Sequence, residues 1–144
     1  MSEAETTPEK YVRPLSAESR GVAPGRNRLK GRKILVVGGG QRVLDAATDP
    51  VGNGRAMSLL FAREGASVIV ADMNLASAEE TATKITSDGG KAQALQADIS
   101  KPGDITRMVT QAHATLGGLD GIVLNVGIGV GPLGLAGANA DDWD

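Results

Sequence analysis

The feature that most constrains this chain is an apolar run followed at once by glycines, within residues 33–54. Residues 34–37 (Ile-Leu-Val-Val) are short, continuous and rich in β-branched side chains, a pattern typical of a strand buried on both faces. Gly38 follows, and residues 52–54 (Gly-Asn-Gly) open a stretch with helical character. A strand, a glycine turn and a helix start present backbone N–H groups and a positive helix end to a phosphate. The stretch therefore indicates a phosphate-binding turn, and the alternative that the glycines form an ordinary turn stays open until the surrounding residues are considered.

The glycines of this stretch have different physical roles. Gly38 can turn sharply with a positive φ, which a residue with a Cβ resists. Gly52 leaves room for a pyrophosphate near the backbone, and Gly54 allows the helix to pack closely on the strand. Between them, residues 41–50 form a polar excursion that we expect to bulge outward as a surface loop. Gly38 and Gly52 should then meet around the pyrophosphate as if the excursion were absent.

Composition narrows the functions available to the chain. Its 144 residues suit one domain with a core, and a formal net charge of −2 offers no electrostatic basis for binding nucleic acid or an anionic membrane. Cysteine is absent, which excludes disulfides, thiolate nucleophiles and cysteine zinc sites, and we expect no metal site. The single histidine, His113, falls on a predicted helix as a surface side chain.

The ends of the chain differ from its middle. Residues 1–28 mix charged residues, proline and serine without an apolar period, and predict a disordered tail before a nucleotide-binding domain at 29–144. No apolar segment typical of a signal peptide follows the first charges. Residues 122–138 carry no charge but are broken by Pro132 and several glycines, and they are shorter than the roughly 20 residues that a membrane span needs. We therefore expect a soluble, cytoplasmic protein with no membrane partner.

After the glycine stretch, predicted strands and helices alternate. Strands at 67–71, 92–97 and 119–124 are separated by helices whose apolar residues recur at three- and four-residue spacing. We expect Asn74 to cap the second helix and Ser100 to cap the third. The first helix should bury an apolar stripe: Ala56, Leu59, Leu60 and Phe61. Strands joined in this way form right-handed crossovers, so the sequence predicts an α/β fold of three layers, α/β/α, with a doubly wound, Rossmann-like parallel sheet.

Polar residues and a glycine stand at the carboxyl ends of the predicted strands: Gly38, Asp72, Asp98 and Asn125. In a doubly wound sheet these ends form the crevice that binds the ligand. Asp72 lies 18 positions after Gly54, close to the offset of about 20 at which a carboxylate binds a ribose 2′-hydroxyl. Two simpler interpretations stay open, with Asp72 as a turn residue before Asn74 and Asp98 as the lead-in to a helix.

These residues, taken in order, resemble the short-chain dehydrogenases/reductases over residues 29–144. The family's Thr-Gly-x-x-x-Gly-x-Gly is matched by Val37-Gly38 and, after the excursion, by residues 52–54. Asp72 resembles the acidic position of NAD-type members. Asp98-Ile99 resembles the pair that contacts adenine, and Asn125-Val126-Gly127 matches part of the motif after the fourth strand. The resemblance implies cofactor contacts from the following residues: Gly38, Gly52, Asn53, Gly54, Asp72, Met73, Asp98, Ile99, Asn125 and Gly127.

The chain also departs from the family pattern. Val37 replaces the usual threonine, Leu124 replaces the first asparagine of the fourth-strand motif, and the excursion interrupts a phosphate loop that is normally continuous. The family's catalytic serine and Tyr-x-x-x-Lys have no counterpart, because the only tyrosine is Tyr11 and no Tyr-x-x-x-Lys occurs in the sequence. We therefore expect no catalytic residue in this chain, a fold truncated after the fourth strand, and no dehydrogenase activity from the chain alone.

The resemblance implies the cofactor-binding half of an NAD(P)-dependent oxidoreductase, which transfers hydride between nicotinamide and a small-molecule alcohol or carbonyl substrate. NAD is expected rather than NADP, because the Asp72 carboxylate would repel a 2′-phosphate. Arg42 or Arg55 would soften this preference if either side chain reached that pocket. The full-length form is expected to be a homo-oligomer.

Two other functions stay open. A class I S-adenosylmethionine-dependent methyltransferase also has a glycine loop and acidic strand ends, although the Asn125-Val-Gly motif and the Gly-Asn-Gly-Arg-Ala helix start favour the dehydrogenase. Comparing the binding of a dinucleotide with that of S-adenosylmethionine separates these two. The other alternative is a non-catalytic dinucleotide-binding sensor. A Tyr-x-x-x-Lys beyond residue 144 in the gene would instead indicate the enzyme.

Overall fold

The computed structural model describes residues 16–18, 20–41 and 50–127. Parallel strands alternate with helices along this part of the chain. The strands are β1 (Lys33–Val37), β2 (Ser67–Asp72), β3 (Lys91–Gln96) and β4 (Gly121–Leu124). The helices are α1 (Asn53–Arg63), α2 (Leu75–Ser87) and α3 (Pro102–Leu116). The alternation predicted from the sequence is confirmed.

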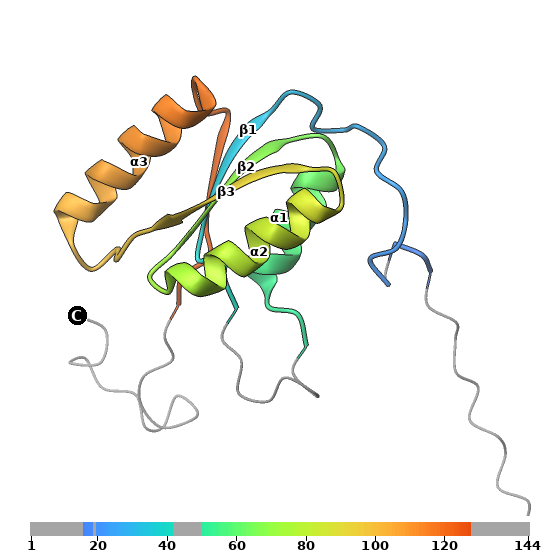
Figure 1. Cartoon of the computed structure of the whole chain (residues 1–144), viewed down its shortest axis with the longest axis horizontal. Coiled ribbons are helices and arrows are strands. Elements are labelled where there is room, and N and C mark those ends of the chain that lie inside the picture. The colour runs from blue at the N-terminus through green and yellow to red at the C-terminus, as the bar shows by residue number, and fades with distance from the viewer. Residues whose placement is uncertain (1–15, 19, 42–49, 128–144) are drawn as a thin grey trace, which may run out of the picture.

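The sheet has the strand order β3-β2-β1-β4, and every neighbouring pair is parallel. The chain moves outward from β1 to β3 and then crosses back to place β4 on the other side of β1 (Figure 1). The strand order therefore reverses beside β1, and in such sheets the crevice at this reversal binds the ligand. The carboxyl ends of β1 and β4 lie together there, since Val37 pairs with Leu124.

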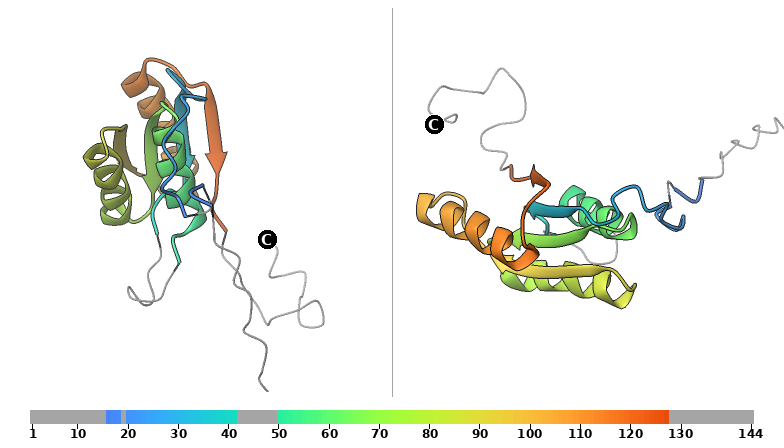
Figure 2. Two further views of the ribbon diagram at one scale, coloured as in Figure 1. Left: turned by 90° about the vertical axis from the view of Figure 1, so that its right-hand side faces the viewer. Right: turned by 90° about the horizontal axis from the view of Figure 1, so that it is seen from above.

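β1 contributes to the hydrophobic core on both faces of the sheet. Ile34 and Val36 lie in one core cluster with side chains of α1 and α2, whereas Leu35 and Val37 lie in a second cluster with side chains of α3. Figure 2 shows helices on both faces of the sheet. All these β1 side chains are buried, as expected for a central parallel strand that is covered on two sides. The predicted α/β/α, doubly wound fold is confirmed.

The buried face of α1 differs from the prediction. Its buried residues are Gly54, Arg55, Ser58 and Ala62. Of the expected stripe, Leu59 and Phe61 are only partly buried, and Ala56 and Leu60 are exposed. The helix is rotated relative to the expected stripe because Gly54 packs against the end of β1 and because Arg55 bonds to α2.

The helix caps are partly as expected. Asn74 caps α2, since its side-chain oxygen accepts a hydrogen bond from the Ser77 N–H at 3.2 Å. Ser100 does not cap α3: the N-cap is Lys101, and no side chain caps that position. The Ser100 backbone N–H and hydroxyl instead donate to the Asp98 carboxylate at 3.1 and 2.7 Å. The prediction for Ser100 was wrong because Asp98 competes for its hydroxyl.

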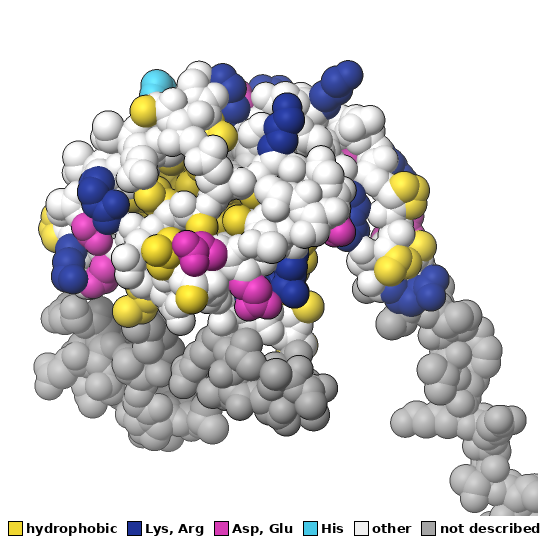
Figure 3. Space-filling model, in the orientation of Figure 1, with side chains coloured by type: hydrophobic (Ala, Val, Ile, Leu, Met, Phe, Trp, Pro, Cys, Tyr) yellow, Lys and Arg dark blue, Asp and Glu magenta, His cyan; other side chains and the backbone are white. Residues whose placement is uncertain are grey.

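β4 carries exposed apolar side chains beside the open edge of the sheet. Within the described ranges β4 pairs only with β1, and Ile122, Leu124 and Val126 are exposed, Leu124 to 77%. An open strand edge with apolar side chains promotes association with other chains. Elsewhere the surface is mixed, and Figure 3 shows acidic and basic side chains interspersed over one face. No helix in the described ranges has the length and apolar character needed to cross a bilayer.

The segment before β1 is attached to the domain through Glu64. The Glu64 Oε2 accepts from the backbone N–H groups of Arg26 and Arg28 at 3.0 and 3.1 Å, and Oε1 pairs with the Arg28 guanidinium at 2.9 Å. Leu29 N–H also donates to the Glu64 carbonyl at 2.8 Å. Contacts with the domain therefore begin before the expected boundary at residue 29. Residues 1–15 of the expected tail lie outside the described residues.

Protonation of Glu64 is expected to weaken this attachment. Hydrogen bonds from the Arg28 side chain and backbone, with the Arg26 backbone, lower the pKa of Glu64 from 4.5 to about 2. Because the folded-state pKa is depressed, the stabilisation is complete above pH 4.5 and is lost as the pH falls toward 2. Thermal unfolding of Glu64→Gln between pH 2 and 7 should show a lower midpoint than wild type at pH 7 and a smaller fall below pH 4.5. Glu79→Gln, an exposed change on α2, should follow wild type, and identical curves for all three proteins would exclude this role of Glu64.

Candidate functional site

The glycine turn after β1 is hydrogen-bonded to the end of β2. Gly38 has φ +77°, a left-handed conformation that side chains resist, and its N–H donates to the Ala71 carbonyl at 2.8 Å. The Gly39 N–H donates to the same oxygen at 3.0 Å. A Cβ on Gly38 would overlap the Asn125 carbonyl. The turn therefore requires glycine both for its conformation and for its space.

The start of α1 lies directly against this turn. A Cβ on Gly54 would overlap the Gly38 carbonyl and lie 2.9 Å from Asn125 Nδ2. Asn125, just after β4, donates from Nδ2 to the same Gly38 oxygen at 3.2 Å and from its backbone N–H to the Val37 carbonyl at 2.9 Å. Gly38, Gly54 and Asn125 therefore lie together at the carboxyl ends of β1 and β4.

Gln41 connects the two ends of the polar excursion. Its side chain donates from Nε2 to the Pro50 carbonyl at 3.2 Å and accepts at Oε1 from the Gly52 N–H at 3.3 Å. Its backbone N–H donates to Ser77 Oγ at 2.6 Å, so the same residue is also bonded to α2. Residues 42–49 lie outside the described residues. No local sequence pattern marks Gln41 for this role, because its partners lie 9 to 36 positions away along the chain.

Gly52 differs from the other two glycines of the phosphate loop. Its φ of −64° and ψ of 150° are open to any residue, and the nearest atom to an added Cβ is Gln41 Cγ at 3.8 Å. The fold therefore does not require glycine at this position. Within the described residues this space is open, and the sequence pattern predicts that a pyrophosphate approaches the backbone there.

Asp72, at the end of β2, faces the phosphate loop. Its Oδ2 accepts from the Gly40 N–H and its Oδ1 from the Asn74 N–H, both at 3.0 Å. The interpretation of Asp72 as a turn residue is therefore correct, and the same carboxylate also supports the glycine loop. A carboxylate has about four acceptor sites, and these two hydrogen bonds leave capacity for ribose hydroxyl groups.

Asp98 lies after β3 at the same edge of the sheet. Hydrogen bonds from the Ser100 hydroxyl and backbone N–H, with an ion pair to Lys101 at 3.2 Å, hold the pKa of the Asp98 carboxyl below its ordinary value. The carboxylate is therefore ionised and also serves as the lead-in to α3. Met73 and Ile99, the neighbouring predicted contacts, expose apolar side chains to 68% and 39%. Gly127 is also exposed, and no atom of the described residues lies within 4 Å of an added Cβ there.

Arg55 is not available to the predicted cofactor pocket. Its side chain is 6% exposed and pairs with Glu80 at 2.9 Å, while Nε donates to Thr81 Oγ1 at 2.9 Å. Both partners belong to α2, so Arg55 joins α1 to α2. It cannot offset the negative charge of Asp72 without breaking these bonds. Arg42 lies outside the described residues.

The site combines a glycine turn, a helix N-terminus and two carboxylates at the carboxyl edge of a parallel sheet. Backbone N–H groups and the helix end suit a pyrophosphate, and the carboxylate at the second strand suits a ribose. Within the described ranges, no group of three or more His, Asp or Glu side chains is placed to hold a metal ion. The arrangement is that of a Rossmann-like α/β fold.

Comparisons with known proteins assign this fold to a family. The family model for short chain dehydrogenase matches residues 46–144. A curated relative, 2-(S)-hydroxypropyl-CoM dehydrogenase 3 from Xanthobacter autotrophicus, is 38% identical over 118 residues, which cover 82% of this chain and 42% of that protein. Another, 2,5-dichloro-2,5-cyclohexadiene-1,4-diol dehydrogenase from Sphingobium indicum, is 37% identical over 75% of this chain and 38% of its own length.

A solved structure supports the same assignment. The crystal structure of hydroxysteroid dehydrogenase from Escherichia coli matches with a TM-score of 0.63 and 30% identity, covering 73% of this chain and 40% of that one. The chain thus spans about two-fifths of the length of the relatives it matches. The chain belongs to the short-chain dehydrogenase/reductase family of oxidoreductases.

Proposed function

We propose that this chain is the NAD-binding half of an oxidoreductase that transfers hydride between nicotinamide and a small-molecule alcohol or carbonyl substrate. The observation that carries the proposal is the packing of Gly54 on Gly38 beside Asn125. This contact sets the α1 N-terminus at the end of β1, where it can bind a pyrophosphate. NAD supplies the hydride acceptor or donor when bound, and the protein supplies binding and orientation.

The parts of the cofactor are assigned to separate residues in this proposal. The phosphate loop, formed by Gly38 and residues 52–54, holds the pyrophosphate, and Asp72 accepts the ribose hydroxyls. The adenine lies against Met73, Asp98 and Ile99. The remaining contacts come from the residues after β4, which are Asn125 and Gly127.

The names of the relatives support the proposed substrate class. Two of them are named for a hydroxypropyl compound and a diol, which supports an alcohol as the substrate class. We place the full-length protein in the cytoplasm as a homo-oligomer. Membership of the family favours a dehydrogenase over a methyltransferase. A non-catalytic sensor would use the same binding site without turnover.

The pyrophosphate assignment is tested by Gly52→Ala. Because the fold leaves room for this methyl group, the variant should keep the wild-type unfolding midpoint. The methyl group would stand where the pyrophosphate approaches, so ADP affinity should fall by about tenfold or more while adenosine affinity stays unchanged. Isothermal titration with ADP and adenosine measures both. If the wild-type protein binds neither ADP nor adenosine, the proposed function is wrong. If Gly52→Ala binds ADP as tightly as wild type does, the pyrophosphate does not lie beside Gly52.

The preference for NAD is tested with the adenine halves of the two cofactors. Wild-type protein should bind 5′-AMP more tightly than adenosine 2′,5′-bisphosphate, because Asp72 would face the added phosphate and Arg55 is held by Glu80. Asp72→Ala should weaken NAD binding by roughly 1.5–3 kcal/mol, the range for a hydrogen bond to a charged group. The same variant should lose the discrimination between the two nucleotides. Tighter binding of the 2′-phosphorylated ligand by wild type would contradict an NAD preference.

A further inference from the structure

A set of hydrogen bonds links the end of β3 to the first turns of α3. The Arg107 guanidinium donates to the Gln96 carbonyl at 3.0 Å and pairs with Asp104 Oδ1 at 3.1 Å. The other Asp104 oxygen accepts from the Asp98 backbone N–H at 3.0 Å. Gln96 Nε2 in turn donates to the Met73 carbonyl at 3.1 Å. We name Gln96, Asp104 and Arg107 together the β3–α3 bracket.

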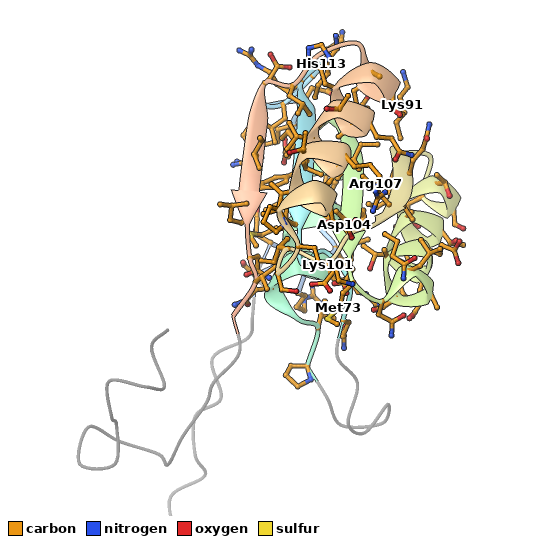
Figure 4. The ribbon with its side chains drawn as sticks, turned by 90° about the vertical axis from the view of Figure 1, so that its left-hand side faces the viewer. Met73, Lys91, Lys101, Asp104, Arg107 and His113 are labelled. Carbon is orange, nitrogen blue, oxygen red and sulfur yellow. The ribbon has the colours of Figure 1, made fainter. Side chains whose placement is uncertain are left out.

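The bracket joins residues on both sides of the loop that carries Asp98 and Ile99. Figure 4 shows Lys101, Asp104 and Arg107 following one another along α3, with Met73 beyond the start of the helix at the same edge of the molecule. Met73 and Ile99 are exposed apolar side chains, and the Asp98 carboxylate lies next to Ile99 in the chain. Two apolar surfaces and a hydrogen-bond acceptor suit a flat aromatic ring that carries an amino group, as adenine does.

The bracket contacts the first turns of α3. The N-cap residue Lys101 provides no side-chain hydrogen bond to the helix. The Asp104 carboxylate, in the first turn of α3, accepts a hydrogen bond from the Asp98 backbone N–H, three residues before the N-cap. The pKa of Asp104 is lowered by the hydrogen bond from the Asp98 backbone and then by Arg107, so its carboxylate is ionised and both of its oxygens have partners.

We propose that Arg107, acting through Asp104 and Gln96, is a positioning residue that orients Asp98, Ile99 and Met73 for the adenine ring of the cofactor. This inference rests on the proposed function, because it concerns the adenine end of that binding site. Arg107 itself has its guanidinium bound to Gln96 and Asp104 rather than directed to a ligand. Removal of the Arg107 side chain should therefore weaken adenine binding by altering the loop at Asp98 and Ile99, and not by removing a direct contact with the ligand.

The test uses the whole chain and 5′-AMP as the probe. Arg107→Met removes both bonds of the guanidinium and should weaken 5′-AMP binding by about tenfold, the equivalent of one charge-assisted hydrogen bond. In Arg107→Lys the ammonium group can bond to either the Gln96 carbonyl or the Asp104 carboxylate, so this variant should bind 5′-AMP with intermediate affinity. Arg32→Met is the matched control, since Arg32 is also an exposed arginine in an ion pair, with Asp120 at 3.4 Å, but it lies at the amino end of β1. The control should bind 5′-AMP as wild type does.

Backbone amide NMR spectra separate positioning from a general loss of structure. In Arg107→Met, the amide signals of Asp98 and Ile99 should move while those of Gly38 and Gly39 in the glycine turn stay in place. Movement of both groups, or wild-type affinity in the methionine and lysine variants, would overturn the inference while leaving the proposed function intact. If wild-type protein does not bind 5′-AMP, the proposed function fails and the inference fails with it.

Discussion

Replacing Gly54 with alanine is expected to destabilise the domain by about 3 kcal/mol or more and to abolish nucleotide binding. The added Cβ would overlap the Gly38 carbonyl and crowd Asn125 Nδ2. A backbone carbonyl cannot rotate aside as a flexible side chain can, so α1 must move away from β1. Because a domain is stabilised by only about 5–15 kcal/mol, this loss is a large share of the total. Urea unfolding and titration with ADP measure the two effects.

Other glycines of the chain serve as controls for the same substitution. Gly103→Ala, in the first turn of α3, adds a methyl group with no atom within 4 Å and should leave stability unchanged or raise it by up to about 1 kcal/mol. Gly52→Ala should retain stability and lose only pyrophosphate affinity. Equal stability of the Gly54 and Gly103 variants would show that α1 does not pack on the glycine turn as described.

The 144-residue chain by itself is expected to show no turnover of NAD with any alcohol or carbonyl compound. Hydride transfer at a carbonyl carbon requires a proton to move at the oxygen, and general acid–base catalysis contributes typically 10²- to 10⁴-fold. The family's Tyr-x-x-x-Lys does not occur in this sequence, and His113 is exposed on α3, near its carboxyl end.

The measurement is NADH formation, followed by absorbance, with purified chain and a panel of alcohols. Binding of 5′-AMP in the same preparation shows that the protein is folded, so an inactive sample is informative. In the described residues β4 pairs only with β1, and this edge should also cause association at high concentration, which light scattering detects. Steady NADH formation that persists through further purification would show that another residue of the chain moves the proton.

The sequence predicted the alternation of strands and helices and which residues follow the strand ends, because those signals are local. The β-branched run of residues 34–37 identified β1, and Asn74 identified the start of α2 through its capping geometry. The strand ends followed from the alternation, which placed Gly38, Asp72 and Asn125 at one edge of the sheet.

The tertiary structure alone decided which side chains contact one another. Arg55 lies in a helix whose apolar stripe was expected to be buried, yet it is buried itself because Glu80 and Thr81 of α2 satisfy its guanidinium. The Gln41 side chain bonds to Pro50 and Gly52, and its backbone N–H bonds to Ser77 of α2. Asp104 binds the Asp98 N–H because Arg107 holds the far side of its carboxylate. Local sequence determines where helices and strands begin. These contacts instead join residues up to 36 positions apart that become neighbours only when the chain folds, and no periodic pattern in the sequence predicts them.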